Sequence, residues 1–479
     1  MSEVTLNSSE AHECDSTKGI DMRTGQLVSG YIPTIMAIAA ISIYTPSAAT
    51  AGPVEYETEP LYIGFTGAED DDFGFSLAID GSFIAVGARF DDIDGPDSGA
   101  VYVYNRLTRN FLYAPFALDV GPGDLLGGSI AIDNNLLFAT APNDDVGAVS
   151  NAGSVYVFDL TNNGRFLQRL TAPSPVVFDA FGWHVSASDG LIMVGAPSAL
   201  VGGDQTGVTH AYLSSSFSHI TTLVPPDGTP SGFFGGSSAI SSDYVAVTSS
   251  RNDIGIGIGE SGSVYVYDYA SGNLLHKLIP DDPQTEAGFG SSVAIQGDII
   301  AVGAPFTNDN GTNSGSVYIF DAITGNQITK IIPDDSAAFD WFGVEIAIDG
   351  DVLVIGSPFK VHPGGARGSV FIYDLNTFNM IDRVDIPVVN DLSDRFGYAV
   401  AAGEGDILTS NYNESVGGLE TGVAYFIDAI CPPDLNDDGA VNFFDVSELI
   451  NNQPDYNGDG VFNFFDISAF ISDYNMGCP

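Results

Sequence analysis

Basic residues are scarce in this chain, which holds 14 Lys and Arg against 62 Asp and Glu and carries a formal charge of -48 at pH 7. A surface this acidic repels nucleic acid phosphates and anionic lipid headgroups, so we expect no nucleic acid partner and no stable membrane insertion. Dense carboxylates suit a medium rich in divalent cations, because bound calcium neutralises them. The composition therefore favours a protein that works outside the cell.

Cysteine is also scarce, with Cys14, Cys431 and Cys478 in the whole chain. Cys14 falls in a segment that we expect to be removed, so one pair remains. Cys431 and Cys478 lie at the two ends of the last 49 residues. We expect a disulfide between them, which an oxidising compartment permits and which stabilises a small module by about 3–4 kcal/mol.

The apolar stretch at residues 31–44 is too short to span a bilayer comfortably, and Ala49-Thr50-Ala51 follows it. This pattern is typical of a signal peptide with its cleavage site. We therefore interpret residues 1–51 as an export leader and expect a secreted or cell-surface protein. A short membrane anchor is the alternative, and the pattern is compatible with translation from either Met1 or Met22.

Catalytic motifs are missing as well. The sequence has no G-x-S-x-G and no H-E-x-x-H, and its six histidines are scattered. Gly257, Gly259 and Gly262 spell G-x-G-x-x-G, but apolar strands flank them and no helix pattern follows, so we interpret the match as accidental. The sequence predicts no catalytic residue and no organic cofactor.

Repeats are abundant. A Phe-Gly pair, or Leu-Gly in one copy, precedes an apolar strand at seven places spaced 53 to 55 residues apart. Runs of Val, Ile, Tyr and Phe then suggest four short strands in each repeat. Near-continuous apolar runs are typical of strands that are buried on both faces, as in the packed blades of a propeller. The sequence therefore predicts an all-β, seven-bladed β-propeller of four-stranded blades over residues 52–430. The pairs are Phe73-Gly74, Leu126-Gly127, Phe181-Gly182, Phe234-Gly235, Phe289-Gly290, Phe342-Gly343 and Phe396-Gly397.

The fifth repeat shows the expected strands at residues 290–295, 299–305 and 315–320, with residues 274–279 or their equivalents as the edge. Four residues after each repeat glycine stands a small side chain, which fits the crowding of inner strands around one axis. Relief of packing between sheets is the alternative explanation. These residues are Ala78, Ala131, Ser186, Ala239, Ala294, Ala347 and Ala401.

The two ends of the array indicate how the ring closes. The seventh repeat ends with Val423–Ile427 and has no fourth strand of its own, whereas an unassigned strand pattern, Pro60–Phe65, precedes the first repeat. We expect Pro60–Phe65 to complete blade seven, because this pairing removes an open sheet edge.

The repeats resemble FG-GAP repeats, the family of integrin alpha-chain propellers and many bacterial surface proteins. The resemblance covers about residues 57–430 and includes a second signature, Gly-Ala-Pro, which is intact at residues 195–197 and 303–305. It is nearly intact at 87–89 and 356–358 and has decayed at 140–142, 248–250 and 409–411. The resemblance implies an extracellular propeller for ligand binding or adhesion.

Family members also place a calcium-binding loop after Gly-Ala-Pro, and three loops here are rich in oxygen ligands. The alternative is that these side chains cap their own turns, as Asp and Asn commonly do. The candidate residues are Asp91, Asp92, Asp94 and Asp97 in the first loop, Asn143, Asp144 and Asp145 in the second, and Asn308, Asp309, Asn310 and Asn313 in the third.

Two titratable residues stand apart. Among the residues two positions after the repeat glycines, His184 in blade three and Glu345 in blade six alone are titratable. We expect them near the axis, where they could face each other. A ligand or catalytic role is one interpretation, and ordinary polarity at the mouth of the channel is the other.

The C-terminal residues 431–479 carry two twelve-residue loops with EF-hand spacing, which begin 21 residues apart. Side-chain oxygens at positions 1, 3, 5, 9 and 12 and the peptide oxygen at position 7 predict two Ca²⁺ sites, with Gly439 and Gly460 at the sharp turns. The predicted ligands are Asp434, Asn436, Asp438, Ala440, Asn442 and Asp445, and then Asp455, Asn457, Asp459, Val461, Asn463 and Asp466.

Asp at position 12 and one helix per loop make this segment resemble a dockerin, in the Cys-bracketed form found in exported planctomycete-type proteins. The resemblance implies a cohesin-like or surface partner. Positions 10 and 11, which are commonly polar in cellulosomal dockerins, hold Phe443-Phe444 and Phe464-Phe465 here. Either these phenylalanines contact a different partner, or they form the core of the module.

Our leading interpretation is an exported, non-catalytic calcium-binding protein. Its propeller binds an extracellular protein or glycan, and its dockerin-like module serves assembly or surface attachment. One alternative is a polysaccharide-active hydrolase or lyase carried on a dockerin, although such enzymes need paired carboxylates and the inner strands offer Glu345 alone. The other alternative is a structural surface-layer component, which must associate with itself.

Overall fold

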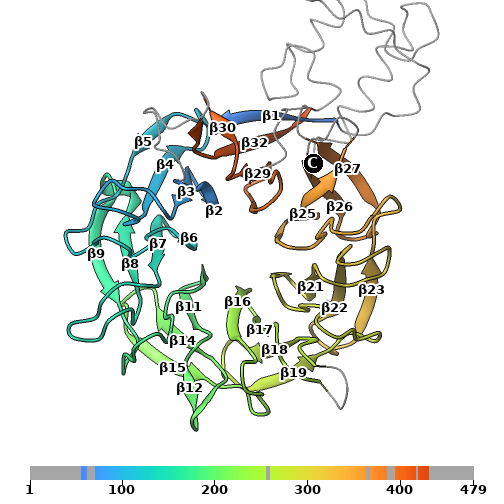
Figure 1. The fold of residues 1–479 in the computed structure, drawn as a ribbon, viewed down its shortest axis with the longest axis horizontal. Coiled ribbons are helices and arrows are strands. Elements are labelled where there is room, and N and C mark those ends of the chain that lie inside the picture. Colours follow the sequence, from blue (N-terminus) through green and yellow to red (C-terminus); the bar gives the residue numbers. More distant parts are fainter. Residues whose placement is uncertain are drawn as a thin grey trace, which may run out of the picture. The chain divides into compact units, whose positions relative to one another are not determined.

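The computed structural model describes residues 55–61, 71–254, 259–362, 367–385, 394–416 and 419–430. These described residues form seven four-stranded antiparallel sheets, which confirms the predicted all-β, seven-bladed propeller. Inner strands of consecutive sheets contact each other, and β2 of the first contacts β28 of the last, so the sheets close into a ring (Figure 1). We number the blades by the repeat that supplies the inner strand.

The strands of blades one to three are given in order from the axis outward. Blade one holds β2 (Phe73–Asp80), β3 (Phe83–Ala88), β4 (Ala100–Asn105) and β5 (Phe111–Tyr113). Blade two holds β6 (Ile130–Asp133), β7 (Leu136–Ala141), β8 (Ser154–Asp159) and β9 (Arg165–Leu170), with the short 3₁₀ helix Leu160–Asn162 before β9. Blade three holds β10 (Val185–Ser188), β11 (Leu191–Ala196), β14 (Val208–Leu213) and β15 (His219–Leu223).

Blades four to seven continue in the same order. Blade four holds β16 (Phe234–Ile240), β17 (Tyr244–Ser249), β18 (Ser263–Asp268) and β19 (Leu274–Leu278). Blade five holds β20 (Val293–Gln296), β21 (Ile299–Ala304), β22 (Ser316–Asp321) and β23 (Gln327–Ile331). Blade six holds β24 (Ile346–Asp349), β25 (Val352–Val361), β26 (Arg367–Asp374) and β27 (Met380–Asp385). Blade seven holds β28 (Val400–Gly403), β29 (Asp406–Asn411), β32 (Val423–Ile430) and β1 (Glu55–Leu61).

Two small hairpins extend from the loops that follow second strands. They are β12 (Leu200–Val201) with β13 (Asp204–Gln205) in blade three, and β30 (Ser415–Val416) with β31 (Leu419–Glu420) in blade seven. The strand at Leu274–Leu278 is the edge of blade four, and its equivalent Gln327–Ile331 is the edge of blade five. None of the helices in the described ranges is long and apolar enough to cross a membrane.

The ring closes by pairing the two ends of the array. β1 pairs with β32 in antiparallel register from Glu55 opposite Ile430 to Leu61 opposite Ala424, and the two strands lie side by side in Figure 1, one blue and one red. The predicted closure of blade seven by the N-terminal strand is confirmed. The strand begins earlier than predicted, at Glu55, and residues 62–65 of the predicted strand lie outside the described residues.

The hydrophobic core lies between neighbouring blades. The six signature phenylalanines have no exposed area, and Leu126 is 3% exposed. Each phenylalanine packs against an aromatic side chain of the third strand, as Phe234 does on Tyr265 with ring centroids 5.4 Å apart. Burying one such side chain stabilises the fold by about 1.5–3 kcal/mol. Each repeat therefore contributes a buried apolar side chain that stabilises an interface between blades.

The two signature glycines meet across the blade interface. A Cβ atom added to Gly195 of blade three would lie 1.9 Å from the carbonyl oxygen of Gly235 in blade four, and Gly235 itself has a φ of +88°. Gly303 and Gly343 make the same contact between blades five and six, at 2.0 Å. Close approach of two backbones explains why the repeat needs glycine at both places.

The small residues predicted for the axis do lie on the inner strands. Ala78, Ala294 and Ala401 are buried there. Ser186 of blade three and Ser238 of blade four have their hydroxyl oxygens 2.8 Å apart. Contacts of this kind between inner strands leave no room for long side chains.

Candidate functional site

A cavity of about 530 Å³ opens at one end of the ring, and its lining comes from all seven blades. The lining residues come from equivalent places in each repeat, at the start of the inner strand and the end of the second strand, which are adjacent because these strands are antiparallel. Residues two positions after the repeat glycine form part of this wall. They are Ser76, Ser129, His184, Ser237, Glu345 and Ala399.

Two serines of this wall use their hydroxyls to join blades. Ser76 Oγ donates to the carbonyl oxygen of Gly127 in the next blade at 2.7 Å, and Ser129 Oγ accepts from the backbone N–H of Val185 in the next blade at 3.1 Å. The wall is therefore held in place by the same interfaces that close the ring.

His184 and Glu345 line this one cavity, as the sequence suggested. Desolvation lowers the pKa of His184 to about 4 and raises the pKa of Glu345 to about 8. Both side chains are therefore mainly uncharged at neutral pH. His184 Nδ1 lies 3.3 Å from the hydroxyl of Ser238, which holds the imidazole against the neighbouring blade.

Aromatic rings and arginines surround the mouth of the cavity. The guanidinium of Arg89 lies 3.6 Å from the ring centroid of Phe75 and forms an ion pair with Asp72 at 2.9 Å. Phe75 also packs on Tyr398, which packs on Tyr412 at 4.4 Å. This cluster combines flat apolar surfaces with a positive charge, although the protein as a whole is strongly acidic.

A second cluster of rings lies across blades five and six. Trp341 packs between Phe306 and Phe359, at centroid distances of 5.1 and 4.4 Å. The guanidinium of Arg395 lies 4.4 Å from the ring centroid of Phe359. Of this cluster, Phe306 lines the cavity, and the other rings and Arg395 follow from it through successive contacts.

A second hollow of about 580 Å³ adjoins the first over blades three to five. The two hollows share five lining residues, namely Trp183, Phe233, Ser250, Ser291 and Phe306. Trp183 and Phe233 pack edge to face at 5.3 Å, and Arg251 lies 5.0 Å over the Phe233 ring. We call this second hollow the lateral groove. Sequence reasoning missed it and its aromatic rim. The available signal was the residue directly after each repeat glycine, which is aromatic in blades one, three and seven.

In the candidate calcium loop of blade one, two of the four carboxylates accept hydrogen bonds from nearby residues. Asp91 accepts hydrogen bonds from the backbone N–H of Ile93 at 2.8 Å and from the hydroxyl of Tyr102 at 2.5 Å, and Asp92 accepts from the N–H of Asp97 at 2.8 Å. Desolvation and the nearby Asp91 raise the pKa of Asp94. Within the described residues this loop forms no ion pair, so its negative charge is not compensated by a basic side chain.

The candidate loops of blades two and five receive a basic side chain from the outer strand. Asp144 forms an ion pair with Arg169 at 2.5 Å, and Asp309 with Lys330 at 2.8 Å. Burial opposes ionisation of Asp309, but hydrogen bonds from Lys330 and Ser316 outweigh it and lower its pKa. Asn308 accepts from the backbone N–H of Asn313 at 2.9 Å, as Asp92 does from Asp97.

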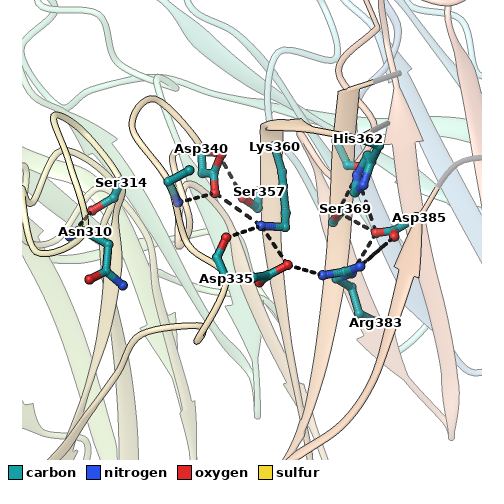
Figure 2. A network of polar contacts seen from close by, with 12 residues as sticks. Asn310, Ser314, Asp335, Asp340, Ser357, Lys360, His362, Ser369, Arg383 and Asp385 are labelled. Atoms are coloured by element: carbon teal, nitrogen blue, oxygen red, sulfur yellow. Dashed lines mark hydrogen bonds and ion pairs between the residues drawn. The ribbon is translucent and has the colours of Figure 1, made fainter. Parts of the chain in front are cut away.

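Blade six supplies a cation of its own. The residue four positions after the first residue of the Gly-Ala-Pro signature is Asp91, Asp144, Asn252 or Thr307 in blades one, two, four and five, but Lys360 in blade six. Lys360 is 5% exposed, and its ammonium lies 2.9 Å from the Asp335 carbonyl oxygen and 3.4 Å from Asp340 Oδ2 (Figure 2).

Arg383 of β27 extends this network. Its guanidinium joins Asp335 at 2.6 Å to Asp385 at 2.9 Å, and Ser369 Oγ donates to Asp385 at 2.7 Å (Figure 2). Burial opposes ionisation of Asp335, but Lys360 and Arg383 lower its pKa. In this blade an ammonium and a guanidinium therefore neutralise the carboxylates of the loop region.

Across the part of the chain that the structure describes, no group of three or more His, Cys, Asp or Glu is placed to hold a metal ion. Several predictions fall outside the described residues. They are the leader at residues 1–51, the two calcium loops and the disulfide within residues 431–479, and Gly257 of the glycine pattern. Gly259 and Gly262 of that pattern lie in the connection between β17 and β18, with no helix after them.

A family model described as FG-GAP repeat matches four segments of the chain, residues 66–104, 217–267, 273–320 and 326–373. Comparison with curated proteins gave no match. Among solved structures, the chain is similar to the crystal structure of the computationally designed Ika8 protein, with 14% sequence identity, a TM-score of 0.43, and coverage of 75% of this chain and 97% of that one. The matched segments and the seven sheets together show that this chain carries FG-GAP repeats folded as a seven-bladed β-propeller.

Proposed function

We propose that this is an exported, non-catalytic protein that binds an extracellular ligand, a protein or a glycan, at one end of its propeller. The observation that carries the proposal is the pair of joined hollows at that end, lined by aromatic and polar side chains from every blade. FG-GAP propellers suggest ligand binding or adhesion, and concave sites with a few polar groups among apolar ones are where ligands bind.

Attachment is the second part of the proposal. The dockerin-like residues 431–479 bind two Ca²⁺ and hold the propeller to a cohesin-like or surface partner. The support is the EF-hand spacing of both loops, from Asp434 to Asp445 and from Asp455 to Asp466, and the bracketing pair Cys431 and Cys478.

Calcium in the propeller itself is a narrower proposal. The loop of blade one is the best candidate, because Asp91, Asp92, Asp94 and Asp97 have no basic partner among the described residues. The loops of blades two and five are poorer candidates, since Arg169 and Lys330 already neutralise them.

The test uses the secreted full chain, a propeller of residues 52–430, and an excess of EDTA in parallel samples. Binding to extracellular matrix or cell-wall material should be retained by the propeller alone, and retention of the protein at the cell surface should need residues 431–479 and calcium. A propeller that binds nothing in this assay contradicts the ligand-binding function.

An enzyme is a second candidate because of one observation. The pKa of Glu345 is raised to about 8 in the axial cavity, which is the state a general acid needs. Glycosidases commonly use two carboxyl groups, however, and Glu345 is the one carboxyl group among the described lining residues of that cavity. Glycan cleavage by the wild type that disappears in Glu345→Gln with the fold retained would favour the enzyme over the binding protein.

A structural surface-layer component differs from both in that it must associate with itself. Sedimentation of the full chain with and without calcium separates the two, because the binding protein proposed here is expected to show no concentration-dependent polymer.

A further inference from the structure

The lateral groove breaks the sevenfold repetition of the propeller, and the cause is visible in the sequence. The residue directly after the repeat glycine is bulky in blade three, Trp183, but small in the next two blades, Gly236 and Ser291. A Cβ atom on Gly236 would lie 2.7 Å from the Phe233 ring, so glycine allows this ring to lie close over the backbone. One large side chain followed by two small ones leaves a hollow over blades four and five.

We infer that the lateral groove is a binding site for a neutral oligosaccharide. The inference rests on the proposed ligand-binding function and names the ligand class and the residues. It is carried by three features of the groove, which are an aromatic wall, an array of uncommitted hydroxyl and amide groups, and a near balance of charge.

The aromatic wall consists of Trp183, Phe233 and Phe306, one from each of blades three, four and five. Trp183 is 50% exposed, although a side chain of this size is normally buried. It is held edge to face against Phe233, so its orientation does not have to be ordered on binding. The exposed ring of Trp183 presents an apolar surface to the C–H face of a sugar ring.

The rest of the groove lining is mainly polar. Thr285, Asn308, Thr312 and Asn313 are part of it, and Thr285, Asn308 and Thr312 are exposed. Asn308 is oriented from both sides, because its backbone N–H donates to Gln284 at 2.8 Å and its Oδ1 accepts from the N–H of Asn313 at 2.9 Å. The side-chain NH₂ of Asn308 and the hydroxyls of Thr285 and Thr312 have no partner among the described residues, so they are free for sugar hydroxyls.

Charge selects against acidic ligands. The charged residues of the groove are Arg251, Glu260 and Glu286, which sum to one negative charge. In the adjoining axial cavity, His184 and Glu345 are mainly uncharged at neutral pH. A sulfated or uronic-acid chain would gain little from one guanidinium beside two carboxylates, within a protein of charge -48.

The shape favours a small ligand over a protein surface. A hollow of about 580 Å³ falls in the range of small-molecule sites, about 300–1,000 Å³. A stable protein interface instead needs a much larger and flatter area.

The test measures binding of the full chain to neutral oligosaccharides, namely cello-, xylo-, manno- and chito-oligosaccharides of four to six units, by calorimetry at pH 7 (about 25 °C). Sulfated and uronic-acid oligosaccharides of similar length run in parallel. We expect at least one neutral series to bind and Trp183→Ala to weaken it about tenfold or more, as the loss of an aromatic anchor typically does. Asn308→Ala should weaken it as well.

The matched control is Phe339→Ala. Phe339 is a ring exposed to a similar degree, 57%, and does not line the groove. Its loss should leave binding unchanged, and melting curves of all variants check that the propeller stays folded. If Trp183→Ala unfolds, Trp183→Leu and Asn308→Ala carry the same test.

The outcomes separate this inference from the function on which it rests. Neutral oligosaccharide binding that Trp183→Ala and Asn308→Ala leave intact overturns the site, and preference for acidic chains overturns the ligand class. A propeller that binds extracellular proteins but no oligosaccharide overturns this inference alone and leaves the binding function standing. A propeller that binds neither overturns both.

Discussion

At the scale of single residues, the blades differ most in how they neutralise the carboxylates of the loop region after the second strand. Blade two uses Arg169 and blade five uses Lys330, both from the outer strand, whereas blade six uses Lys360 near the end of its second strand, β25. The described carboxylates Asp91 and Asp94 of blade one have no such partner. Either a basic side chain or a metal ion can neutralise the carboxylates of such a loop. A bound cation is therefore expected first in blades whose loop carboxylates have no basic partner.

We predict that Lys360→Met destabilises the propeller by about 3–5 kcal/mol, because it leaves the buried Asp340 without its cation. Asp340 is 3% exposed. The control is Lys277→Met, whose partner Asp227 has a side chain that is 56% exposed, and it should cost about 0–1 kcal/mol. Urea unfolding measures both. The double variant Lys360→Met with Asp340→Asn should recover most of the lost stability. Equal losses of stability in Lys360→Met and Lys277→Met would argue against a buried ion pair at Lys360.

The second prediction concerns Glu345. Because its pKa is raised from 4.5 to about 8 in the folded state, the folded protein holds this proton more tightly than the unfolded chain. The stability that the proton provides is therefore complete below about pH 4.5 and is lost as the pH rises to about 8.

Glu345→Gln should remove this dependence. The urea midpoint of the variant should rise relative to wild type as the pH increases from about 5 to about 9. Glu286→Gln, which removes an exposed carboxylate at the groove, serves as the control for the change in net charge. Wild-type and Glu345→Gln curves that run parallel across this range would show that Glu345 does not keep its proton in the folded state.

At the scale of the elements, the two signatures of the repeat act at the same interface. The phenylalanine fills the space between blades, and the two glycines allow the backbones to touch, as at Gly195 and Gly235. Where the Gly-Ala-Pro glycine has become Thr140, a Cβ atom on the facing Gly182 would lie 3.4 Å from the Thr140 Cβ, the same distance as from a Cβ atom on Gly343 to the Gly303 Cα. The repeat can therefore lose its second glycine in some blades and still form the sheet.

We predict that deleting residues 57–66 removes most of β1 and leaves β32 as an open edge with unpaired backbone groups. Leu61, which is 2% exposed in the core between blades seven and one, is lost with it. The shortened protein should aggregate or melt well below the intact propeller. Deletion of residues 431–479 is the comparison and should leave the melting of the propeller nearly unchanged. An intact melting temperature after the N-terminal deletion would mean that β1 does not hold the ring closed.

At the scale of the whole molecule, calcium is the variable that we expect to couple the parts. The twelve predicted ligands in residues 431–479 include ten side-chain oxygens that repel one another without cations. Titration of the full chain should therefore show two Ca²⁺ more than titration of residues 52–430. Asp445→Ala with Asp466→Ala should abolish these two. An equal stoichiometry in the two proteins would refute the calcium sites of the C-terminal module.

The seven-bladed fold could be predicted from the sequence because each blade is a local unit. Spacing of 53 to 55 residues, apolar runs and the Phe-Gly pairs are all properties of neighbouring residues, and the missing strand of blade seven left one candidate for closure. The position of His184 and Glu345 near the axis followed from the same periodicity. Residues at the same position of each repeat occupy equivalent places in the blades. Once one such residue is located, the seven equivalent residues are located as well.

The lateral groove and the ion pairs were decided by the tertiary structure alone. Trp183, Phe233 and Phe306 meet although each belongs to a different repeat, and Arg169 reaches Asp144 from the outer strand of the blade. No local pattern encodes these contacts, because they depend on how far one blade is rotated against the next and on which side chain is small enough to leave space. Periodicity therefore determines where a residue lies on the ring, whereas packing between blades determines which residues share a site.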